Sequence, residues 1–337
     1  MKWLNKPDKN SITPIYQQIK NSVISAVEDK KLLIGDSIPS INKICSEFEL
    51  APGTIIRAYD ELREMGIISS KQGKGYFISG TQIEKKTRIF LLFDRMNAFK
   101  EILYDSFRNE FTEETDIQVF FHHYDTKRFE KLVRENLGKF SHYILMPHLN
   151  ASIQRIVQRI PEKRLIFIDN LPPDLQTTSK AVYQDFYNDI YNALFEKVAE
   201  IRKYKTINLS LSKSDFQFVP AAIKNGFTRF CIDNSLQHNI IQNITELNLK
   251  RNHLYIIFDD SELLNTLKII QKKGWLLKED IGIISFDETP MKELLAGGIS
   301  VLSTDFELMG KTAAEMVKGK LTGQIANPFT LIYRNSF

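Results

Sequence analysis

Residues 88–337 alternate between short apolar runs and longer segments with helical periodicity. Eight apolar runs have the length of buried strands, at 89–93, 117–121, 143–146, 165–168, 207–211, 229–232, 254–258 and 281–286. Helical patterns lie among them at 126–137, 186–203, 260–273 and 306–319. Apolar strands joined by helices are typical of a parallel α/β sheet that is covered on both faces. Because about 250 residues is large for one such sheet, we predict two similar lobes.

The first 80 residues follow a different pattern, which predicts three helices and a hairpin. Apolar residues recur at helical spacing within 15–27, 41–48 and 55–62. Ser40 can cap the second helix, Pro52 and Thr54 open the third, and Gly66 can end it. The second and third helices, joined by a short turn, form a candidate helix-turn-helix.

The third of these helices has a second face that suits the major groove of DNA. Gly53, Ile56 and Arg57 lie opposite its apolar stripe. An arginine can bond guanine or a phosphate, and an exposed isoleucine can contact a thymine methyl group. A glycine at the helix start lets backbone N–H groups approach a phosphate closely. We therefore expect this helix to contact bases.

The stretch KQGKGYF at residues 71–77 follows the third helix. Gly73 and Gly75 permit positive-φ backbone, and Lys71 and Lys74 flank the turn. A hairpin of this kind can place its lysines on phosphates or in a narrow minor groove. An ordinary glycine hairpin with solvated lysines is the alternative, but the preceding three helices favour a DNA-binding wing.

The N-terminal pattern resembles the winged-helix domain of the gluconate-repressor (GntR) family of bacterial transcription regulators. The matching motifs lie within residues 12–78 and are Ile38-Pro39-Ser40, Thr54, Arg57-Ala58-Tyr59, Leu62, Gly66-Ile67-Ile68 and the hairpin 72–77. This chain departs from the family pattern at 51–53, at Asn42 and at Ile56, where the family often has polar or basic residues. The predicted DNA-binding residues are Ser40, Asn42, Pro52, Gly53, Thr54, Ile56, Arg57, Lys71, Gln72, Gly73, Lys74 and Gly75.

Polar residues gather after the predicted strands of the α/β region. Ligands of open parallel sheets lie beyond the carboxyl ends of the strands. Those ends carry Asp94 with Asn97 and Phe99, His148, Asp169, the pair Asp259-Asp260, and Asp287. Carboxylates accept hydrogen bonds from hydroxyls and aromatic rings cover C–H surfaces, so the set suits a polyhydroxylated ligand. For Asp260, which precedes a helix, a capping role is equally expected.

The α/β region resembles the effector domain of lactose-repressor (LacI) family regulators, of periplasmic-binding-protein type I fold. The likeness is carried by EDIGIISFDETP (279–290), VLSTDFELMGKTAAEMV (301–317) and LIYRNS (331–336). It implies that Asp287 bonds sugar hydroxyls, that Asp169, Asp259 and Asp260 face the ligand, and that Thr304 and Phe306 lie near the hinge and cleft. Many relatives have an arginine where this chain has Ile223.

These readings divide the chain into a winged-helix domain at 1–79, a linker at 80–87 and an effector domain at 88–337. We expect lobe 1 to span about 88–182 and 306–327, and lobe 2 about 183–303 and 329–337. The predicted partners are double-stranded operator DNA, a monosaccharide such as a pentose or deoxyhexose, and a second copy in a homodimer.

Composition and the absence of certain motifs narrow the classes of protein to which the chain can belong. Two cysteines allow no disulfide framework, and we find no signal peptide and no stretch that could cross a bilayer, so we expect a cytoplasmic protein. A net charge of +4 does not by itself imply nucleic acid. We predict no metal, cofactor or catalytic residue, because no nucleotide-binding, hydrolase or zinc motif occurs. A sugar-binding protein without a regulatory role and, less expected, an enzyme are the other hypotheses.

Overall fold

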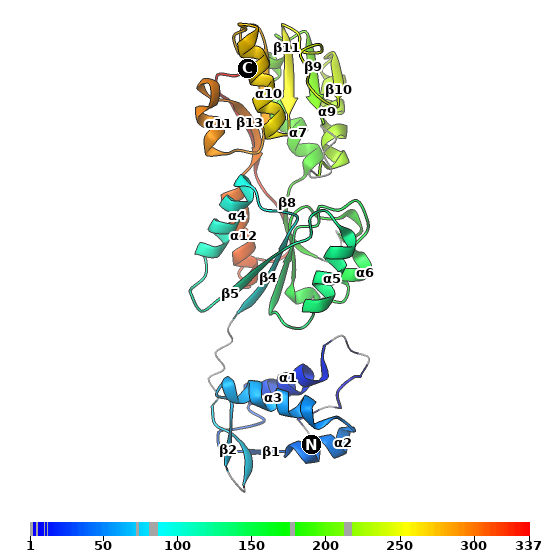
Figure 1. Ribbon diagram of the computed structural model, residues 1–337, viewed down its shortest axis with the longest axis vertical. Coiled ribbons are helices and arrows are strands. Elements are labelled where there is room, and N and C mark those ends of the chain that lie inside the picture. The colour runs from blue at the N-terminus through cyan, green and yellow to red at the C-terminus, as the bar shows by residue number, and fades with distance from the viewer. Residues whose placement is uncertain are drawn as a thin grey trace. The chain divides into compact units, whose positions relative to one another are not determined.

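The computed structural model describes residues 3–4, 6–9, 11, 13–71, 74–80, 87–175, 179–211 and 218–337. The chain divides into two compact units, one holding residues 1–88 and the other almost all of residues 89–337. Figure 1 shows the helices and strands of each unit. Within the described part of the chain, no helix is both long and apolar enough to cross a membrane.

The N-terminal unit is a winged helix-turn-helix, as predicted. Three helices pack on a small antiparallel sheet of strand order β1-β3-β2. The elements are α1 (Ile15–Glu28), β1 (Ser37–Ile38), α2 (Ile41–Phe48), α3 (Pro52–Glu64), β2 (Ile68–Lys71) and β3 (Gly75–Ile78). The Ser40 side chain caps α2 by accepting a hydrogen bond from the Lys43 N–H at 3.3 Å. Gly66 follows α3 with a φ of 69°, a conformation that favours glycine.

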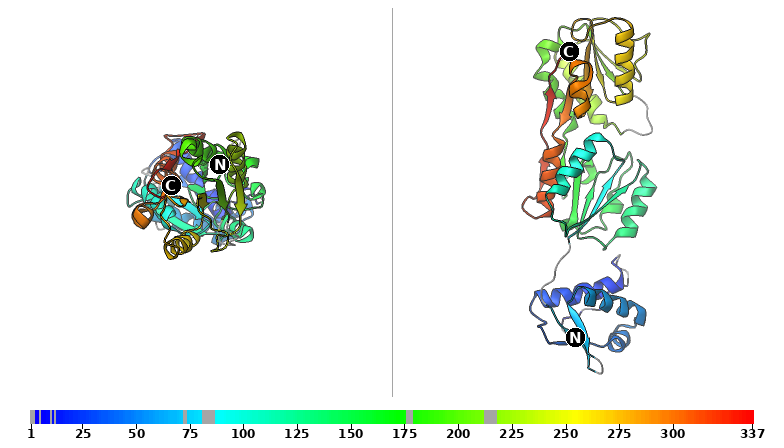
Figure 2. Two further views of the ribbon diagram at one scale, coloured as in Figure 1. Left: turned by 90° about the horizontal axis from the view of Figure 1, so that it is seen from above. Right: turned by 60° about the vertical axis from the view of Figure 1, so that its left-hand side comes forward.

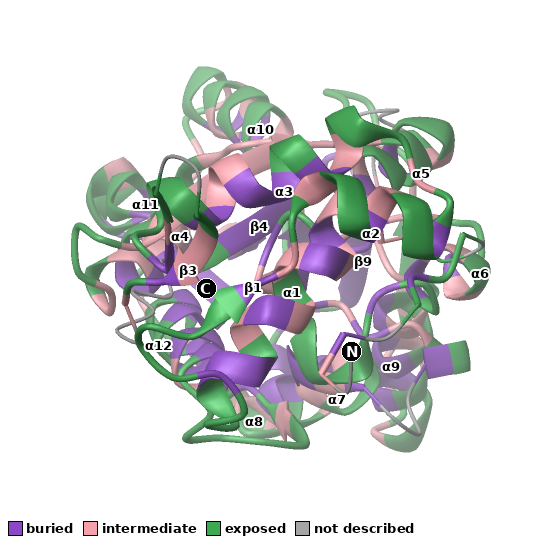
Figure 3. Ribbon diagram, turned by 90° about the horizontal axis from the view of Figure 1, so that it is seen from below, coloured by how far each residue is buried: buried purple, intermediate pink, exposed green. Residues whose placement is uncertain are grey.

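Each helix of this unit buries one face and leaves the other exposed. Figure 3 shows α1 and α3 with buried and exposed bands along the same helix. The buried residues of α3 are Ile55, Ala58, Tyr59 and Leu62, which is the stripe expected from their spacing. Tyr59 also packs edge-on against Tyr76 of β3, with ring centroids 4.8 Å apart. This packing ties the third helix to the hairpin.

The second unit contains two six-stranded sheets, and we call the first sheet with its helices lobe 1. Its strand order is β14-β8-β7-β6-β4-β5. Helices α4 and α12 cover one face, while α5 and α6 lie on the other (Figure 1). The elements are β4 (Arg88–Phe93), α4 (Ala98–Asn109), β5 (Asp116–Phe121), α5 (Thr126–Asn136), β6 (His142–Leu145), α6 (Gln154–Val157), β7 (Leu165–Asp169), β8 (Lys180–Tyr183), α12 (Phe306–Val317) and β14 (Gln324–Ala326).

Lobe 2 is the other sheet with its helices. Its order is β10-β9-β11-β12-β13-β15, parallel except for the antiparallel edge strand β15. Figure 2 shows α10 on the opposite side of this sheet from α7 and α9. The elements are α7 (Phe186–Phe195), α8 (Val198–Ile201), β9 (Thr206–Ser210), α9 (Ala221–Asp233), β10 (His238–Ile241), β11 (His253–Ile257), α10 (Asp260–Lys272), β12 (Gly282–Phe286), α11 (Pro290–Leu294), β13 (Ser300–Thr304) and β15 (Phe329–Ile332).

The chain passes between the two sheets three times. It leaves lobe 1 between β8 and α7, returns between β13 and α12, and leaves again between β14 and β15. The sequence therefore alternates between lobes near its end, and each lobe is completed by segments that are distant in the chain. This confirms the predicted two-sheet parallel α/β fold.

One predicted strand was wrong. Residues 229–232 lie inside the helix α9, and its buried residues are Ile223, Gly226, Phe227, Phe230 and Cys231. That spacing of three and four is the helical period, which a four-residue apolar window cannot distinguish from a strand. The strands β8, β10, β13, β14 and β15 were not among the predicted runs.

Candidate functional site

The predicted DNA-binding residues lie on the outer surface of the winged helix. Ile56 of α3 is 43% exposed although it is apolar, and Gly53 and Arg57 beside it are exposed as well. Thr54 is half-buried next to them, and Pro52 is exposed in the first turn. Ser40 and Asn42 are exposed at the start of α2. Most of the helix face predicted to contact bases is therefore exposed within its own unit.

Arg57 is held by its neighbours. Its guanidinium lies 3.9 Å from the centre of the Tyr16 ring, and it donates to the Tyr16 hydroxyl at 3.1 Å. It also contacts Glu61 at 3.4 Å, and Glu61 is bound in turn by Lys20 of α1 at 2.5 Å. These contacts fix Arg57 by way of α1, which sequence spacing on α3 could not show.

The hairpin of β2 and β3 carries the predicted wing residues. Lys71 pairs with Gly75 across the hairpin, and its ammonium lies 5.4 Å from the centre of the Phe77 ring. Lys74 is exposed, and Gly75 has a φ of 91°. Gln72 and Gly73, also predicted to contact DNA, lie outside the described residues.

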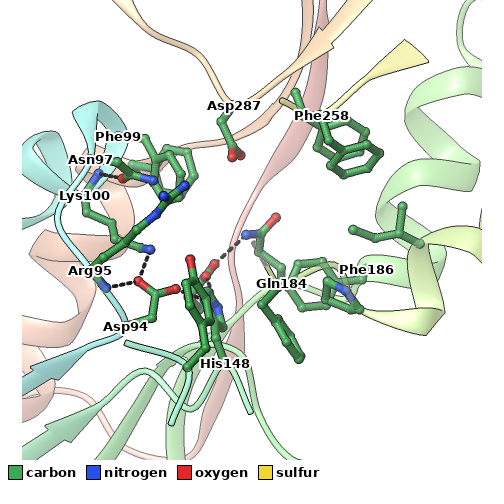
Figure 4. Close-up of a pocket in the computed structure, with 17 residues that line it drawn as sticks. Asp94, Arg95, Asn97, Phe99, Lys100, His148, Gln184, Phe186, Phe258 and Asp287 are labelled. Atoms are coloured by element: carbon green, nitrogen blue, oxygen red, sulfur yellow. Dashed lines mark hydrogen bonds and ion pairs between the residues drawn. The ribbon is translucent and has the colours of Figure 1, made fainter. Parts of the chain in front are cut away.

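The second unit has a pocket to which both lobes contribute (Figure 4). Seven of the ten predicted effector-binding residues line it, and they are Asp94, Asn97, Phe99, His148, Asp169, Asp287 and Phe306. They come from the carboxyl ends of β4, β6, β7 and β12 and from the starts of α4 and α12. The position of the pocket follows the rule for open parallel sheets.

A chain of buried charges forms the lobe 1 side of the pocket. His148 lies between two carboxylates, with Nδ1 2.7 Å from Asp94 Oδ2 and Nε2 2.7 Å from Asp169 Oδ2. The other oxygen of Asp94 accepts a bond from Lys100, which is 1% exposed. The other oxygen of Asp169 accepts from the Gln184 amide at 2.5 Å. Positive and negative groups alternate along this chain, so each is neutralised by its neighbours.

The charge states of this chain follow from its contacts. Burial opposes a charge on His148, but hydrogen bonds and charge attraction from Asp169 and Asp94 outweigh it and raise the pKa of His148 to about 9. Burial likewise opposes ionisation of Asp94, yet His148 and Lys100 hold its pKa well below the usual range. The histidine is therefore a cation and Asp94 is a carboxylate at neutral pH.

Asp287 faces this chain from lobe 2. Figure 4 shows its carboxylate extending toward the lobe 1 side chains, and no described residue hydrogen-bonds that carboxylate. Burial raises the pKa of Asp287 to about 7, even though Lys292 acts in the opposite direction. Its backbone has a φ of 60°, and that of Asp169 has a φ of 70°. Both strand-end aspartates thus adopt a conformation that side chains rarely take, which is typical of functional sites.

The Asp287 backbone is fixed by a buried lysine. Lys292 is 1% exposed, and its Nζ donates to the backbone oxygens of Phe286 at 2.5 Å and Asp287 at 2.8 Å. The same ammonium lies 2.8 Å from Asp260 Oδ1 at the start of α10. One ammonium therefore holds the turn that presents the Asp287 carboxylate.

Aromatic pairs enclose the polar groups. Phe99 and Phe306 stack with ring centroids 4.4 Å apart, and Phe258 and Phe286 stack at 3.7 Å. The His148 ring stacks on Phe218 at 5.0 Å. The pocket combines apolar ring faces with a few fixed polar groups, which is the usual composition of a small-molecule site.

Three predicted effector residues do not line the pocket. Asp259 caps α10, where its carboxylate accepts the Glu262 N–H at 2.8 Å. Asp260 is paired with Lys292, as described above. Thr304 is 4% exposed, and its hydroxyl bonds to the Pro328 carbonyl and the Asn327 amide. Each of these polar side chains is taken up by local structure near a helix start or a crossing between the lobes.

Several lining residues were not predicted from the sequence. Phe258 and Phe286 end predicted strands, and Arg95 directly follows Asp94, so their positions offered a signal. Gln184 follows β8, a strand that was not among the predicted runs. Lys100, Tyr124, Phe186, Phe218, Pro220 and Ile223 come from helices and loops that reach the pocket only in the folded chain. Ile223, noted as a departure from related sequences, therefore adds apolar surface to the pocket.

Comparisons with known proteins match both units. The pattern of bacterial regulatory proteins of the gntR family matches residues 15–78, and that of a periplasmic binding protein-like domain matches residues 206–337. The uncharacterized HTH-type transcriptional regulator YhcF of Bacillus subtilis is 36% identical over 69 residues, covering 20% of this chain and 57% of YhcF. The HTH-type transcriptional repressor YtrA of the same organism is 31% identical over 96 residues, covering 28% of this chain and 70% of YtrA.

Solved structures resemble the second unit. A LacI family transcriptional regulator from Silicibacter pomeroyi aligns with a TM-score of 0.62 at 17% identity, over 74% of this chain and 98% of that one. A LacI family regulator from Arthrobacter sp. FB24, solved in complex with lactose, aligns with a TM-score of 0.59 at 17% identity, over 74% and 99%. At this identity the likeness establishes the fold.

A winged helix joined to a two-lobed periplasmic-binding-protein-like unit is the architecture that these comparisons and the structure define, and its N-terminal part is that of a bacterial transcription regulator. The chain belongs to the gntR family of bacterial regulatory proteins.

Proposed function

We propose that this protein is a repressor of a carbohydrate utilisation operon, and that a sugar bound between its lobes changes its affinity for operator DNA. The observation that carries the proposal is the pocket, in which the Asp287 carboxylate, hydrogen-bonded by no residue that the structure describes, faces the polar groups of lobe 1 between stacked phenylalanines. Sugar hydroxyls donate to carboxylates, and ring faces cover sugar C–H surfaces. The structural relatives solved with lactose and with D-xylulofuranose support this ligand class.

The domain limits that we propose are 1–79 for the DNA-binding domain, 80–87 for the linker and 88–337 for the effector domain. Residues 81–86 of the linker lie outside the described part of the chain. We propose further that two copies form a homodimer, so that two winged helices meet two half-sites of a palindromic operator. A pentose or a deoxyhexose is the proposed effector.

Regulation in this scheme requires that the sugar binds one arrangement of the lobes more tightly than another. A ligand that binds both arrangements of the lobes with equal affinity does not change their populations, however tightly it binds. Contacts to Asp287 in lobe 2 and to the lobe 1 groups satisfy this requirement, because both sets engage the same ligand only when the lobes enclose it. The spacing of two DNA-binding units in a dimer would then change with sugar binding.

A sugar-binding protein without a regulatory role and an enzyme are the competing functions. The winged helix and the curated relatives, which are transcription regulators, favour regulation over both. A gel shift with the DNA upstream of its own gene, repeated with each member of a monosaccharide panel, tests the proposal directly. The absence of any DNA binding, or DNA binding that no sugar changes, would contradict it.

We expect the substitution Lys74→Ala to weaken binding to that DNA and to reduce the salt dependence of the binding. A lysine that neutralises one phosphate contributes about 0.9 to the slope of log K against log salt. Fluorescence anisotropy between about 50 and 200 mM salt measures the slope. Lys272→Met, an exposed change on α10, is the control and should leave it unaltered. An unchanged slope for Lys74→Ala would remove this lysine from the phosphate contacts.

We expect Lys292→Met to weaken sugar binding although Lys292 itself does not line the pocket. The methionine cannot donate to the carbonyls of Phe286 and Asp287, so the turn that presents the Asp287 carboxylate loses its anchor. Calorimetric titration with the sugar that binds wild type would show about a tenfold loss or more. Asp260→Asn is a milder variant that keeps both carbonyl bonds and should lose less. Equal affinities in wild type and both variants would exclude the positioning role.

A further inference from the structure

We propose that the pocket selects an uncharged sugar, oriented by Arg95 from lobe 1 and Asp287 from lobe 2, and that it rejects phosphorylated and carboxylated sugars. This inference rests on the proposed function and adds the exclusion of charged sugars, together with the residues that cause it. It makes Arg95 a specificity-determining residue.

The cations of the charge chain are not available to an anionic ligand. Lys100 is 1% exposed and is bound to Asp94. His148 has both ring nitrogens 2.7 Å from carboxylate oxygens, so neither N–H is left to donate to a ligand. The positive charge of lobe 1 is thus used to hold Asp94 and Asp169 in place.

Arg95 is the remaining cation of the lining, and one nitrogen of its guanidinium has no hydrogen-bond partner among the described residues. This nitrogen, Nε, is buried, while the residue itself lines the pocket. Asp287 is its counterpart in lobe 2, since its carboxylate accepts no hydrogen bond from any residue that the structure describes. One lobe therefore offers an unused donor and the other an unused acceptor.

A hydroxyl group can satisfy both sides. It accepts a hydrogen bond from a guanidinium through its lone pairs and donates its own proton to a carboxylate. A neutral polyol with hydroxyls at two positions can thus meet Arg95 and Asp287 together without bringing a charge into the pocket. The stacked rings of Phe99 with Phe306 and of Phe258 with Phe286 would cover its apolar faces.

An anionic sugar fits this lining poorly. A phosphate group carries between about one and a half and two negative charges at neutral pH and is usually held by several donors. Here it would meet one available guanidinium and the carboxylates of Asp94, Asp169 and Asp287. Above the pKa of Asp287, as at pH 8, those three carboxylates are balanced by the three cations Arg95, Lys100 and His148, so the lining is neutral before the ligand enters. Burying an unbalanced charge between aromatic rings costs several kcal/mol.

Matched pairs of sugars test the inference on the full chain at pH 8, where Asp287 is ionised. Thermal shift and calorimetry would compare D-ribose with ribose 5-phosphate, D-glucose with glucose 6-phosphate and glucuronate, and D-galactose with galacturonate. Xylose, arabinose, fucose and rhamnose extend the neutral set. We expect a neutral sugar to bind, and its phosphorylated or carboxylated counterpart to bind at least about 30-fold more weakly.

The outcomes separate this inference from the proposed function. Binding of a charged sugar as tight as that of its neutral counterpart, or tighter, would overturn the charge selection while a carbohydrate effector remained. Failure of every sugar to bind would overturn both.

A substitution tests the role of Arg95 itself. Arg95→Gln should weaken binding of the neutral sugar about tenfold or more, because a charge-assisted hydrogen bond is lost. Arg155→Gln, an exposed change on α6 of the same lobe, is the matched control and should bind like wild type. If Arg95→Gln also binds like wild type, Arg95 does not orient the ligand.

Discussion

Asp287→Asn should abolish the sugar-induced rise in melting temperature and, without sugar, should make the protein more stable than wild type at pH 8. The loss of binding follows because the asparagine removes a charged acceptor that points into the pocket. Hydrogen bonds to a charged group contribute about 1.5–3 kcal/mol, so the affinity should fall by a factor of roughly 10 to 150. DNA binding without sugar should persist, because the substitution lies outside the winged helix.

The gain in stability follows from the pKa of Asp287. Burial raises that pKa to about 7 in the folded protein, whereas the pKa of an aspartate in the unfolded chain is near 3.8. Between pH 3.8 and pH 7, therefore, Asp287 is mostly protonated in the folded state and mostly ionised in the unfolded state. The free energy of unfolding of wild type falls as the pH rises through this range. The asparagine does not ionise, so the free energy of unfolding of the variant does not fall in this way. We expect the difference from wild type to be roughly 1–3 kcal/mol at pH 8.

Urea denaturation of wild type and Asp287→Asn at pH 4.5 and pH 8 measures the difference. The two proteins should be nearly equal at the lower pH and should diverge at the higher one. Asp105→Asn, an exposed change on α4, is the control and should show no such divergence. A variant that is less stable than wild type at pH 8, or that keeps the full sugar-induced shift, would refute this account of Asp287.

His148→Leu should destabilise the protein by about 3–5 kcal/mol at pH 7. Removal of the imidazolium leaves Asp94 and Asp169 buried, and of their remaining partners only Lys100 carries a positive charge, while Gln184, Tyr124 and the Arg95 backbone N–H are neutral donors. Breaking a buried ion pair from one side is costly because it leaves an uncompensated charge. The double variant His148→Leu with Asp169→Asn should recover part of the loss, since one of the two unpaired carboxylates is then neutral.

The pH dependence of wild-type stability provides a second measure of His148. Its pKa is raised from 6.5 to about 9 on folding, so its contribution is fully present below pH 6.5 and is lost as the pH rises through 9. Wild-type stability should therefore fall between these values, and His148→Leu should show less of that fall. His123→Asn, an exposed change at a positive φ that asparagine tolerates, should behave like wild type. A wild-type profile that is flat from pH 6.5 to 9 would contradict a charged His148.

Short-range patterns predicted the N-terminal unit in detail. The cap at Ser40, the glycine after α3 and the buried stripe of α3 depend on spacings of a few residues, and all three occur in the structure. A different rule, that the carboxyl ends of parallel strands meet at one edge of a sheet, made Asp169 and Asp287 candidates, and both line the pocket. It also predicted ligand roles for Asp259 and Asp260, whose carboxylates are occupied by a helix cap and by Lys292.

Periodicity and local capping were enough to predict the winged helix, the two-lobed parallel α/β fold and several strand ends that face the pocket. Which polar groups are available to a ligand became apparent only in the folded chain. His148 neutralises carboxylates at the ends of two different strands, Lys292 fixes Asp287, and Arg95 Nε has no hydrogen-bond partner within the described part of the chain. These pairings join segments far apart in the chain, and because charge interactions depend on distance in space, no local pattern encodes them.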